Sequence, residues 1–151
     1  MEQVSFKWQR FGALSTTELH AIYRLRQRVF IVEQNCPYLD ADQYDLETWH
    51  LSAWSTEDRA ILAYLRVFPP GVKYAEASIG RVVTAPEARG TGLGRQIMDE
   101  ALARIRSELS DGAVRISAQS YLRKFYESFR FSCVSEGYLE DDIPHIEMLR
   151  S

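Results

Sequence analysis

The alternation of apolar and polar positions predicts strands and helices in the order β, α, β, β, β, α, β, α, β, β. Strict alternation is typical of a half-buried strand, and apolar residues three and four apart are typical of a helix. Strands are expected over 3–10, 49–54, 60–68, 79–84, 113–118, 131–138 and 145–150. Helices are expected from the capping box at 15–18 to residue 30, over 93–109 and over 121–129. This order predicts an α/β (α+β) fold with a mixed sheet flanked by helices.

No repeat, low-complexity tract or linker divides the 151 residues, of which 46% are apolar. A chain of this length can bury one sizeable core. We therefore expect a single domain over 1–151.

The net charge of -3 disfavours nucleic acid or an anionic membrane as the main partner, because both are bound mainly by basic surfaces. There is no apolar run of membrane-spanning length and no start typical of a signal peptide, so we expect a cytoplasmic protein. Cys36 and Cys133 lack CxxC spacing and are expected to be reduced. The sequence leaves the oligomeric state open, a homodimer included.

A glycine-rich turn joins the strand predicted over 79–84 to the long helix that follows. Pro86 ends the strand, and Gly90, Gly92 and Gly94 let the backbone come close to a ligand. The first amides of the helix have no partner and its dipole adds positive charge, so the turn is suited to a pyrophosphate. No Lys-Ser/Thr follows the glycines, and their G-x-G-x-G spacing does not fit a dinucleotide fingerprint. A glycine-rich turn without a ligand is the alternative.

With both flanks, Arg89-x-x-Gly92-x-Gly94 resembles the signature R/Q-x-x-G-x-G/A of the GNAT superfamily of acyl-CoA-dependent N-acetyltransferases. The resemblance implies that acetyl-CoA is the acyl donor, that the loop amides hold its pyrophosphate, and that the preceding strand pairs with its pantetheine arm. The cofactor-binding residues expected on this basis are Val82, Val83, Thr84, Arg89, Gly90, Thr91, Gly92, Leu93, Gly94 and Arg95.

The segment Phe125-Tyr126-Glu127, with Phe131, is similar to the closing block of the same family, although Arg130 stands where the family has glycine. That departure concerns the end of the helix, where glycine adopts the left-handed conformation freely. Tyr126 matches the family's tyrosine that protonates the departing thiolate, and a buried tyrosine with a satisfied hydroxyl is the alternative. Gln119 stands near the family's usual asparagine and is expected to bond the pantetheine.

Two further segments resemble the ElaA-like branch of the superfamily, whose members carry V-F-V-V-E-Q-N-C-P-Y and E-D-G-I-P-H-I-x-M. They are residues 29–38 and 140–148, with Ile31 and Asp142 as departures. The resemblance spans 24–148 and implies that the first helix and the following loop wall the acceptor pocket. The acceptor-side candidates are Glu33, Gln34, Asn35 and Tyr38.

Acetyl transfer to an amine needs an acceptor for the amine proton and donors for the developing oxyanion. Glu33, His50 and His145 are the candidate proton acceptors, and a histidine titrates near neutrality. Either histidine could instead satisfy backbone groups, and Glu33 could anchor the substrate amine. Arg81 interrupts an apolar strand, so it either binds an acceptor carboxylate or pairs with an internal carboxylate.

A metal is not expected. The segment 40–45 starts like a calcium loop but lacks its glycine, and Leu51 stands where the distal glutamate belongs. The three histidines do not form a zinc spacing. The aspartates of 40–45 are expected to cap turns or to attract a cationic acceptor.

Together these features predict an N-acetyltransferase in which the amine of a small-molecule or peptide acceptor attacks acetyl-CoA directly. The first alternative is a non-catalytic domain that binds acyl-CoA as a sensor or interaction module. The second is an enzyme that transfers a longer acyl chain. The sequence does not identify the acceptor.

Overall fold

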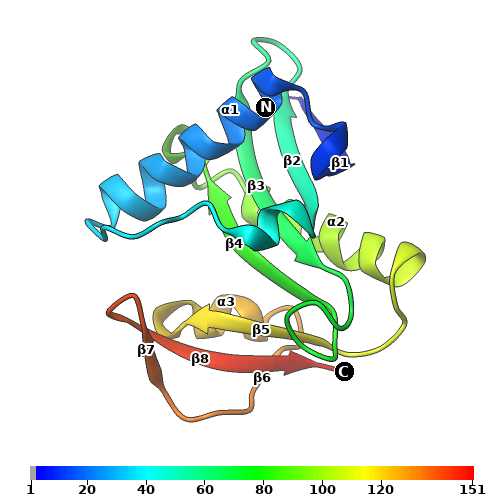
Figure 1. Ribbon diagram of the computed structural model, residues 1–151, viewed down its shortest axis with the longest axis vertical. Helices are drawn as coiled ribbons and strands as arrows, with labels where there is room; N and C mark the ends of the chain where they lie inside the picture. The colour runs from blue at the N-terminus through cyan, green and yellow to red at the C-terminus, as the bar shows by residue number, and fades with distance from the viewer. Residues whose placement is uncertain (1–2) are drawn as a thin grey trace.

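The computed structural model describes residues 3–151, and its elements follow the predicted order closely (Figure 1). The strands are β1 (Val4–Arg10), β2 (Trp49–Ser55), β3 (Ile61–Phe68), β4 (Ser78–Thr84), β5 (Val114–Gln119), β6 (Ser132–Cys133), β7 (Tyr138–Glu140) and β8 (Ile143–Arg150). The α-helices are α1 (Thr16–Arg26), α2 (Leu93–Glu108) and α3 (Arg123–Glu127). Shorter helical segments are η1 (Phe11–Ala13), η2 (Gln27–Glu33), η3 (Gln43–Leu46), η4 (Pro86–Ala88) and η5 (Ser120–Leu122).

Two elements differ from the prediction. The strand expected over 131–138 is two strands, because the four residues 134–137 lie opposite only two residues of β8 and the chain leaves the ladder there. The helix expected to end at residue 30 continues as the π-helical η2 to Glu33, where Gln34 N donates to Val29 O at 3.0 Å. This extension places Phe30 and Gln34 in a cleft that Val82 of β4 also lines.

The first sheet contains β1, β2, β3 and β4 in sequence order, and every neighbouring pair is antiparallel. The helix α1 covers one face of this sheet and α2 the other (Figure 1). Because both faces are covered, β3 is buried along almost its whole length. The buried cluster also includes Ile116 of β5 and Met148 of β8, so the apolar core extends into the second sheet.

The second sheet contains β5, β8 and β6, with β7 also paired to β8, and all of these pairs are antiparallel. The two sheets meet at a parallel bridge between Ala77 and Val114, next to which Arg115 N donates to Ala77 O at 2.9 Å. This bridge is the parallel component of the predicted mixed sheet. Beyond it β4 and β5 diverge (Figure 1), and the described residues contain no further pairing between them. Residues of both strands line a cleft in this region.

A β-bulge shapes the β4 side of the opening. Tyr64 pairs with Val83 and Arg66 pairs with Gly80, so two residues of β4 lie opposite one residue of β3. Arg81 is one of these two and has a left-handed backbone with φ of +53°. A bulge of this kind redirects side chains and removes backbone groups from the ladder. The bulge therefore takes Arg81 and Val82 out of the regular ladder, and both residues line the cleft described below.

A buried network of ion pairs lies at the same end of the first sheet. Its members are Arg26, Arg66, Arg81, Asp40, Asp42 and Asp45. Arg26 lies 2.8 Å from Asp40 and 2.7 Å from Asp45, measured between guanidinium nitrogen and carboxylate oxygen. Three arginines face three aspartates, so the formal charges cancel. The aspartates predicted to cap turns or attract a cationic ligand bind arginines of this chain, and Asp45 also caps a turn, because its carboxylate accepts from Asp42 N at 3.1 Å.

We expect Asp45→Asn to lower the free energy of unfolding by about 3 kcal/mol at pH 7, because it leaves Arg26 and Arg66 short of a buried partner. Burial alone would raise the pKa of Asp45, but Arg26 and Arg66 outweigh it and lower the pKa. The carboxylate therefore stabilises the fold above its unfolded pKa of about 4, and this contribution disappears as the pH falls further. Urea denaturation at several pH values measures the effect.

The control for that experiment is Asp99→Asn, because Asp99 is exposed on α2. It should change the denaturation midpoint far less than Asp45→Asn. A stability difference between Asp45→Asn and the unmodified protein that stayed constant down to acid pH would contradict the assignment of the effect to the charged pair.

Within residues 3–151, no helix has both the length and the apolar character required to cross a membrane.

Candidate active site

The N-terminus of α2 lacks the capping groups that α1 has. In α1, Ser15 Oγ accepts from Glu18 N at 3.0 Å, and the Glu18 carboxylate accepts from Ser15 N at 2.9 Å. In α2 the N-cap is Gly92, no side chain caps the first turn, and that turn contains no acidic residue. The first amides of α2 and its dipole are thus available to an anion.

The loop before α2 has the conformation that its glycines allow. Gly90 and Gly92 have φ of +78° and +83°, and a Cβ on either would meet no atom within 4 Å. The space above both glycines is therefore open. Gly94 approaches Thr84 Oγ1 at ordinary contact distance, 3.6 Å from where its Cβ would lie. The open cradle at the end of an uncapped helix has the shape and polarity that a pyrophosphate requires.

A first cleft runs beside this loop, between β4 and the segment from η5 to α3. Among the residues predicted to bind the cofactor, those that line it are Val82, Val83, Thr84, Arg89, Gly94 and Gln119. Glu33, Gln34 and Tyr126 line the same cleft. The structure therefore gathers residues from three distant parts of the sequence along one cleft.

Three residues of the predicted loop set point elsewhere. The Leu93 side chain is 4% exposed and packs in the core, so only its backbone can face a ligand. Thr91 Oγ1 donates to Ala88 O at 2.6 Å. Arg95 donates to Ser128 Oγ at 2.8 Å and lies over the ring of Phe129.

Glu33 and Arg89 form an ion pair of 2.7 Å across the mouth of the first cleft. Both side chains are more than two-fifths exposed, so the pair contributes at most about 1 kcal/mol of stability. Glu33, a candidate proton acceptor, thus lies beside the predicted pyrophosphate loop. It is not among the residues that line the second cleft described next.

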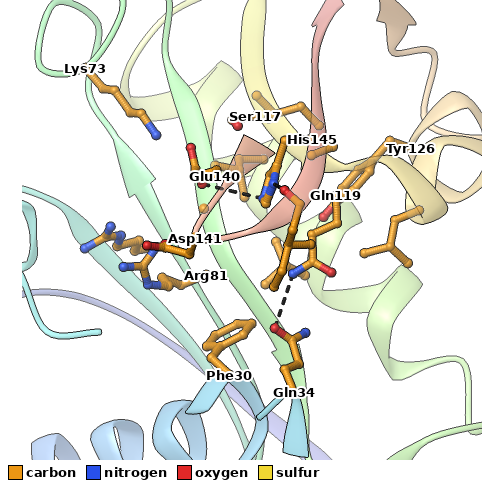
Figure 2. Close-up of a pocket in the computed structure, with 18 of the residues that line it drawn as sticks. Phe30, Gln34, Lys73, Arg81, Ser117, Gln119, Tyr126, Glu140, Asp141 and His145 are labelled. Atoms are coloured by element: carbon orange, nitrogen blue, oxygen red, sulfur yellow. Dashed lines mark hydrogen bonds and ion pairs between the residues drawn. The ribbon is translucent and has the colours of Figure 1, made fainter. Parts of the chain in front are cut away.

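A second cleft fills the opening between β4 and β5 and is closed on its far side by the turn between β7 and β8 (Figure 2). The two clefts share the side chains of six residues and are therefore continuous. The shared residues are Phe30, Gln34, Val82, Gln119, Leu122 and Tyr126. Gln119 Nε2 donates to Gln34 Oε1 across the junction at 3.5 Å (Figure 2).

Tyr126 lies at the junction of the two clefts. Its side chain is 6% exposed, and its hydroxyl has no hydrogen-bond partner within residues 3–151. The alternative of a buried tyrosine with a satisfied hydroxyl therefore does not describe it. Burial raises the pKa of Tyr126, so the hydroxyl keeps its proton at neutral pH and is available as a donor.

His145 lines the second cleft and is held in one tautomer. Its Nδ1 lies 2.7 Å from Ile143 O, and because a carbonyl oxygen only accepts, Nδ1 carries the proton. The other nitrogen, Nε2, is then free to accept a proton and lies 3.5 Å from Glu140 Oε2 (Figure 2). The ring also stacks on Tyr138.

His50 has a different position from the one expected of a proton acceptor. It is fully buried, its Nε2 donates to Asp45 O at 2.8 Å, and its Nδ1 accepts from the Tyr64 hydroxyl at 2.6 Å. Burial lowers the pKa of His50, and both nitrogens are engaged. It lines neither cleft. His50 therefore follows the alternative in which the histidine satisfies a backbone group.

The acceptor-side candidates are divided between the cleft and its surroundings. Gln34 and Tyr38 line the second cleft, whereas Asn35 is exposed, has φ of +51°, and lines neither cleft. Tyr38 donates to Asp40 Oδ1 at 3.1 Å. Arg81 lines the cleft, but its Nε lies 2.8 Å from Asp40 Oδ1. Of the two alternatives for Arg81, the structure therefore shows the pair with an internal carboxylate.

Sequence reasoning did not single out Arg66, Lys73, Glu140 or Asp141, all of which line the second cleft. Arg66 carried a usable signal, because it interrupts the apolar strand 61–68 as Arg81 interrupts 79–84. Lys73 and Asp141 stand in polar turns, where a charged residue is not informative. Within residues 3–151 no three His, Cys, Asp or Glu side chains form a group that could hold a metal ion.

Arg130 has φ of +71°, so the helix end after α3 adopts the left-handed conformation that the family's glycine would adopt. An arginine tolerates this conformation at a cost of about 1 kcal/mol. The departure from the family pattern therefore leaves the local backbone unchanged.

Comparison with known proteins identifies the family. Residues 51–151 match the model of the acetyltransferase (GNAT) domain. The chain is 40% identical over 147 residues to the UPF0039 protein sll0451 of Synechocystis, covering 97% of this chain and 95% of that protein. It is 38% identical over 148 residues to protein ElaA of Escherichia coli, covering 95% of each.

Solved structures of similar proteins have the same fold. The crystal structure of an acyl-CoA N-acyltransferase from Pseudomonas aeruginosa matches with a TM-score of 0.92 and 43% identity, covering 99% of this chain and 100% of that one. Escherichia coli ElaA matches with a TM-score of 0.90 and 36% identity over the same shares. The chain belongs to the GNAT acetyltransferase family, among the relatives of ElaA and the UPF0039 proteins, and has the fold of the acyl-CoA N-acyltransferases.

Proposed function

We propose that this protein transfers an acetyl group from acetyl-CoA to the amine of a small-molecule or peptide acceptor. The supporting observation is the continuity of the two clefts at Tyr126, with an uncapped helix N-terminus at one end and His145 at the other. An acyl donor and an amine that enter from opposite ends would meet at Tyr126.

At the donor end, the backbone amides of 90–95 would hold the pyrophosphate and β4 residues 82–84 would pair with the pantetheine arm. Gln119 would bond the same arm. The open space above Gly90 and Gly92 and the absence of an acidic residue in the first turn of α2 support this assignment. Arg89 would exchange its weak pair with Glu33 for the phosphate charge.

The transfer would proceed in one displacement. His145 Nε2, assisted by Glu140, would accept a proton from the ammonium form of the acceptor, and the neutral amine nitrogen would then attack the thioester carbonyl carbon. Backbone N–H groups at the β4 bulge are suited to stabilise the oxyanion. As the carbon–sulfur bond breaks, the Tyr126 hydroxyl would protonate the sulfur, and the proton lost by the amine nitrogen would restore the tyrosine. The products are the N-acetylated amine and CoA.

His145→Ala is expected to lower kcat about 10²-fold while leaving the affinity for acetyl-CoA within about twofold, because the imidazole lies on the acceptor side of Tyr126. Single-turnover kinetics and calorimetry of the same preparation measure the two effects. Exposed His20 on α1 provides the control, and His20→Ala should change neither quantity. Equal losses of turnover and donor affinity in His145→Ala would exclude His145 as the base.

Calorimetric titration with acetyl-CoA, CoA and ATP tests the proposed function directly. We expect saturable binding of the two CoA species and none of ATP, followed by thiol release when an amine is added. Binding of acetyl-CoA without thiol release across amine classes would favour the sensor or interaction module. Faster turnover of longer acyl-CoA thioesters would favour the second alternative, an enzyme that transfers a longer acyl chain.

We also retain, as predictions, a single domain over 1–151, a cytoplasmic location, and the absence of a metal, nucleic-acid or membrane partner. For the oligomeric state we make no choice between a monomer and a homodimer.

A further inference from the structure

The ion pairs around the second cleft leave one cation uncompensated. Arg66 and Arg81 face the cleft but are paired with aspartates of the buried network. Lys73 also lines the cleft, and its ammonium has no carboxylate within ion-pair distance among residues 3–151. It lies instead 5.4 Å from the ring centroids of both Phe68 and Tyr74.

A second unsatisfied donor lies against the same ring. Arg66 is 2% exposed, its guanidinium lies over Phe68 with 5.1 Å between guanidinium carbon and ring centroid, and its Nε is buried without a hydrogen-bond partner. A buried donor without an acceptor costs about 1–3 kcal/mol. Lys73 and Arg66 both lie against Phe68, so this end of the cleft is cationic. Because Arg66 Nε is itself buried, Lys73 presents the charge that a ligand can reach.

The opposite charge is found at the turn between β7 and β8. Glu140 and Asp141 line the cleft there, with Glu140 next to His145, and Figure 2 shows Lys73 directed towards this group from the other side. Burial lowers the pKa of Lys73 and the charge of Glu140 only partly opposes this, so the ammonium lacks a full counter-charge. The cleft thus offers a cationic end at Lys73 and an anionic, proton-accepting region nearer to Tyr126.

We infer that the acceptor is an amine that carries a carboxylate, as an amino acid does, and that Lys73 binds this carboxylate. The inference rests on the proposed acetyl transfer and specifies its substrate class. A carboxylate is favoured over a phosphate because one ammonium suits a single negative charge, and Glu140 and Asp141 would repel a second. The acceptor amine then lies beside Glu140 and His145, where it loses its proton.

Matched pairs of amines test this inference. Glycine, β-alanine, 4-aminobutyrate and 6-aminohexanoate each have a partner in which a methyl group replaces the carboxylate: ethylamine, propylamine, butylamine and hexylamine. Rates of CoA release are compared at equal concentrations of neutral amine. We expect the carboxylate member of at least one pair to have a kcat/KM about tenfold or more above that of its partner. Equal values in every pair, or a preference for phosphoethanolamine or 1,4-diaminobutane, would overturn the inference.

Variants of Lys73 test whether this residue binds the acceptor carboxylate. Lys73→Met should remove the preference by lowering kcat/KM for the carboxylate member alone, and Lys73→Arg should retain part of it. The control is Lys7→Met, because Lys7 lies on β1 and pairs with Glu18, away from the cleft. A loss in Lys73→Met that is equal for both members of a pair would indicate a merely structural role and refute the assignment.

A binding experiment separates this inference from the proposed function. Titration of the same pairs into the CoA-loaded protein, followed by NMR chemical shifts, needs no turnover. If no amine releases CoA, the proposed function fails, and a preference for the carboxylate member that is lost in Lys73→Met would still support the binding site. If amines are acetylated but both members of each pair bind equally, the inference fails and the proposed function stands.

Discussion

Gly92→Glu is expected to lower the affinity for acetyl-CoA by at least about 10³-fold, because it places a carboxylate where the pyrophosphate would bind. Gly92 is the N-cap of α2, and the space beyond its missing side chain is open. The new side chain can therefore enter the cradle without a clash in the fold. Its charge would take the place of the phosphate at the helix N-terminus. Calorimetric titration with acetyl-CoA measures the loss.

The chain contains a matched control for this variant. Gly71 has φ of +86°, compared with +83° at Gly92, and a Cβ there would also meet nothing within 4 Å. Gly71→Glu thus introduces the same charge and the same left-handed strain, which costs about 1–2 kcal/mol of stability. Both variants should unfold at similar denaturant concentrations, but only Gly92→Glu should lose acetyl-CoA. Undiminished affinity in Gly92→Glu would refute the assignment of the loop.

Tyr126→Phe is expected to lower kcat about 10³-fold and to leave the affinity for acetyl-CoA within about twofold. The hydroxyl has no protein partner, so its removal leaves no buried group unsatisfied and should not destabilise the fold. The departing thiolate, however, would lose its proton donor. Steady-state kinetics with acetyl-CoA and an active amine measure kcat, and calorimetry measures the affinity.

Tyr64→Phe is the corresponding control, since Tyr64 is also buried but its hydroxyl donates to His50 Nδ1 at 2.6 Å. This variant should lose about 1–2 kcal/mol of stability and keep most of its kcat. Tyr126→Phe would then lose kcat and keep its stability, whereas Tyr64→Phe would lose stability and keep most of its kcat. Normal turnover in Tyr126→Phe would exclude Tyr126 as the acid. If the protein is instead a sensor that never acetylates, the unmodified protein itself would show no turnover.

The candidate donor site was largely predictable from the sequence because its determinants are local. The strand at 78–84, the break at Pro86 and the helix from Leu93 follow one another in the chain, and each has its own signal in residue type or spacing. The positive φ of Gly92 is likewise a property of one residue. The fold class follows from the same local signals, because the order of elements leaves few arrangements.

The acceptor side was less predictable because its partners are distant in sequence. His50 and His145 are equivalent as residue types, and only the structure separates a sealed hydrogen-bonded histidine from one that lines a cleft. Arg81 had two possible partners, and the one that binds it, Asp40, lies 41 positions away. Lys73 gave no signal, because a lysine in a turn is normally a solvated side chain.

The sequence by itself determined the order of the elements, the glycine loop at the start of α2, and membership of the GNAT acetyltransferase family. Those properties depend on local backbone preference and on residues adjacent in the chain. The tertiary structure decided which charges cancel and which do not, because the network of arginines and aspartates forms only when α1, β3 and β4 pack together. It also decided that β4 and β5 separate beyond Ala77, which creates the cleft that His145 and Lys73 line. Charge compensation and cleft shape are properties of packed surfaces, and no single segment encodes them.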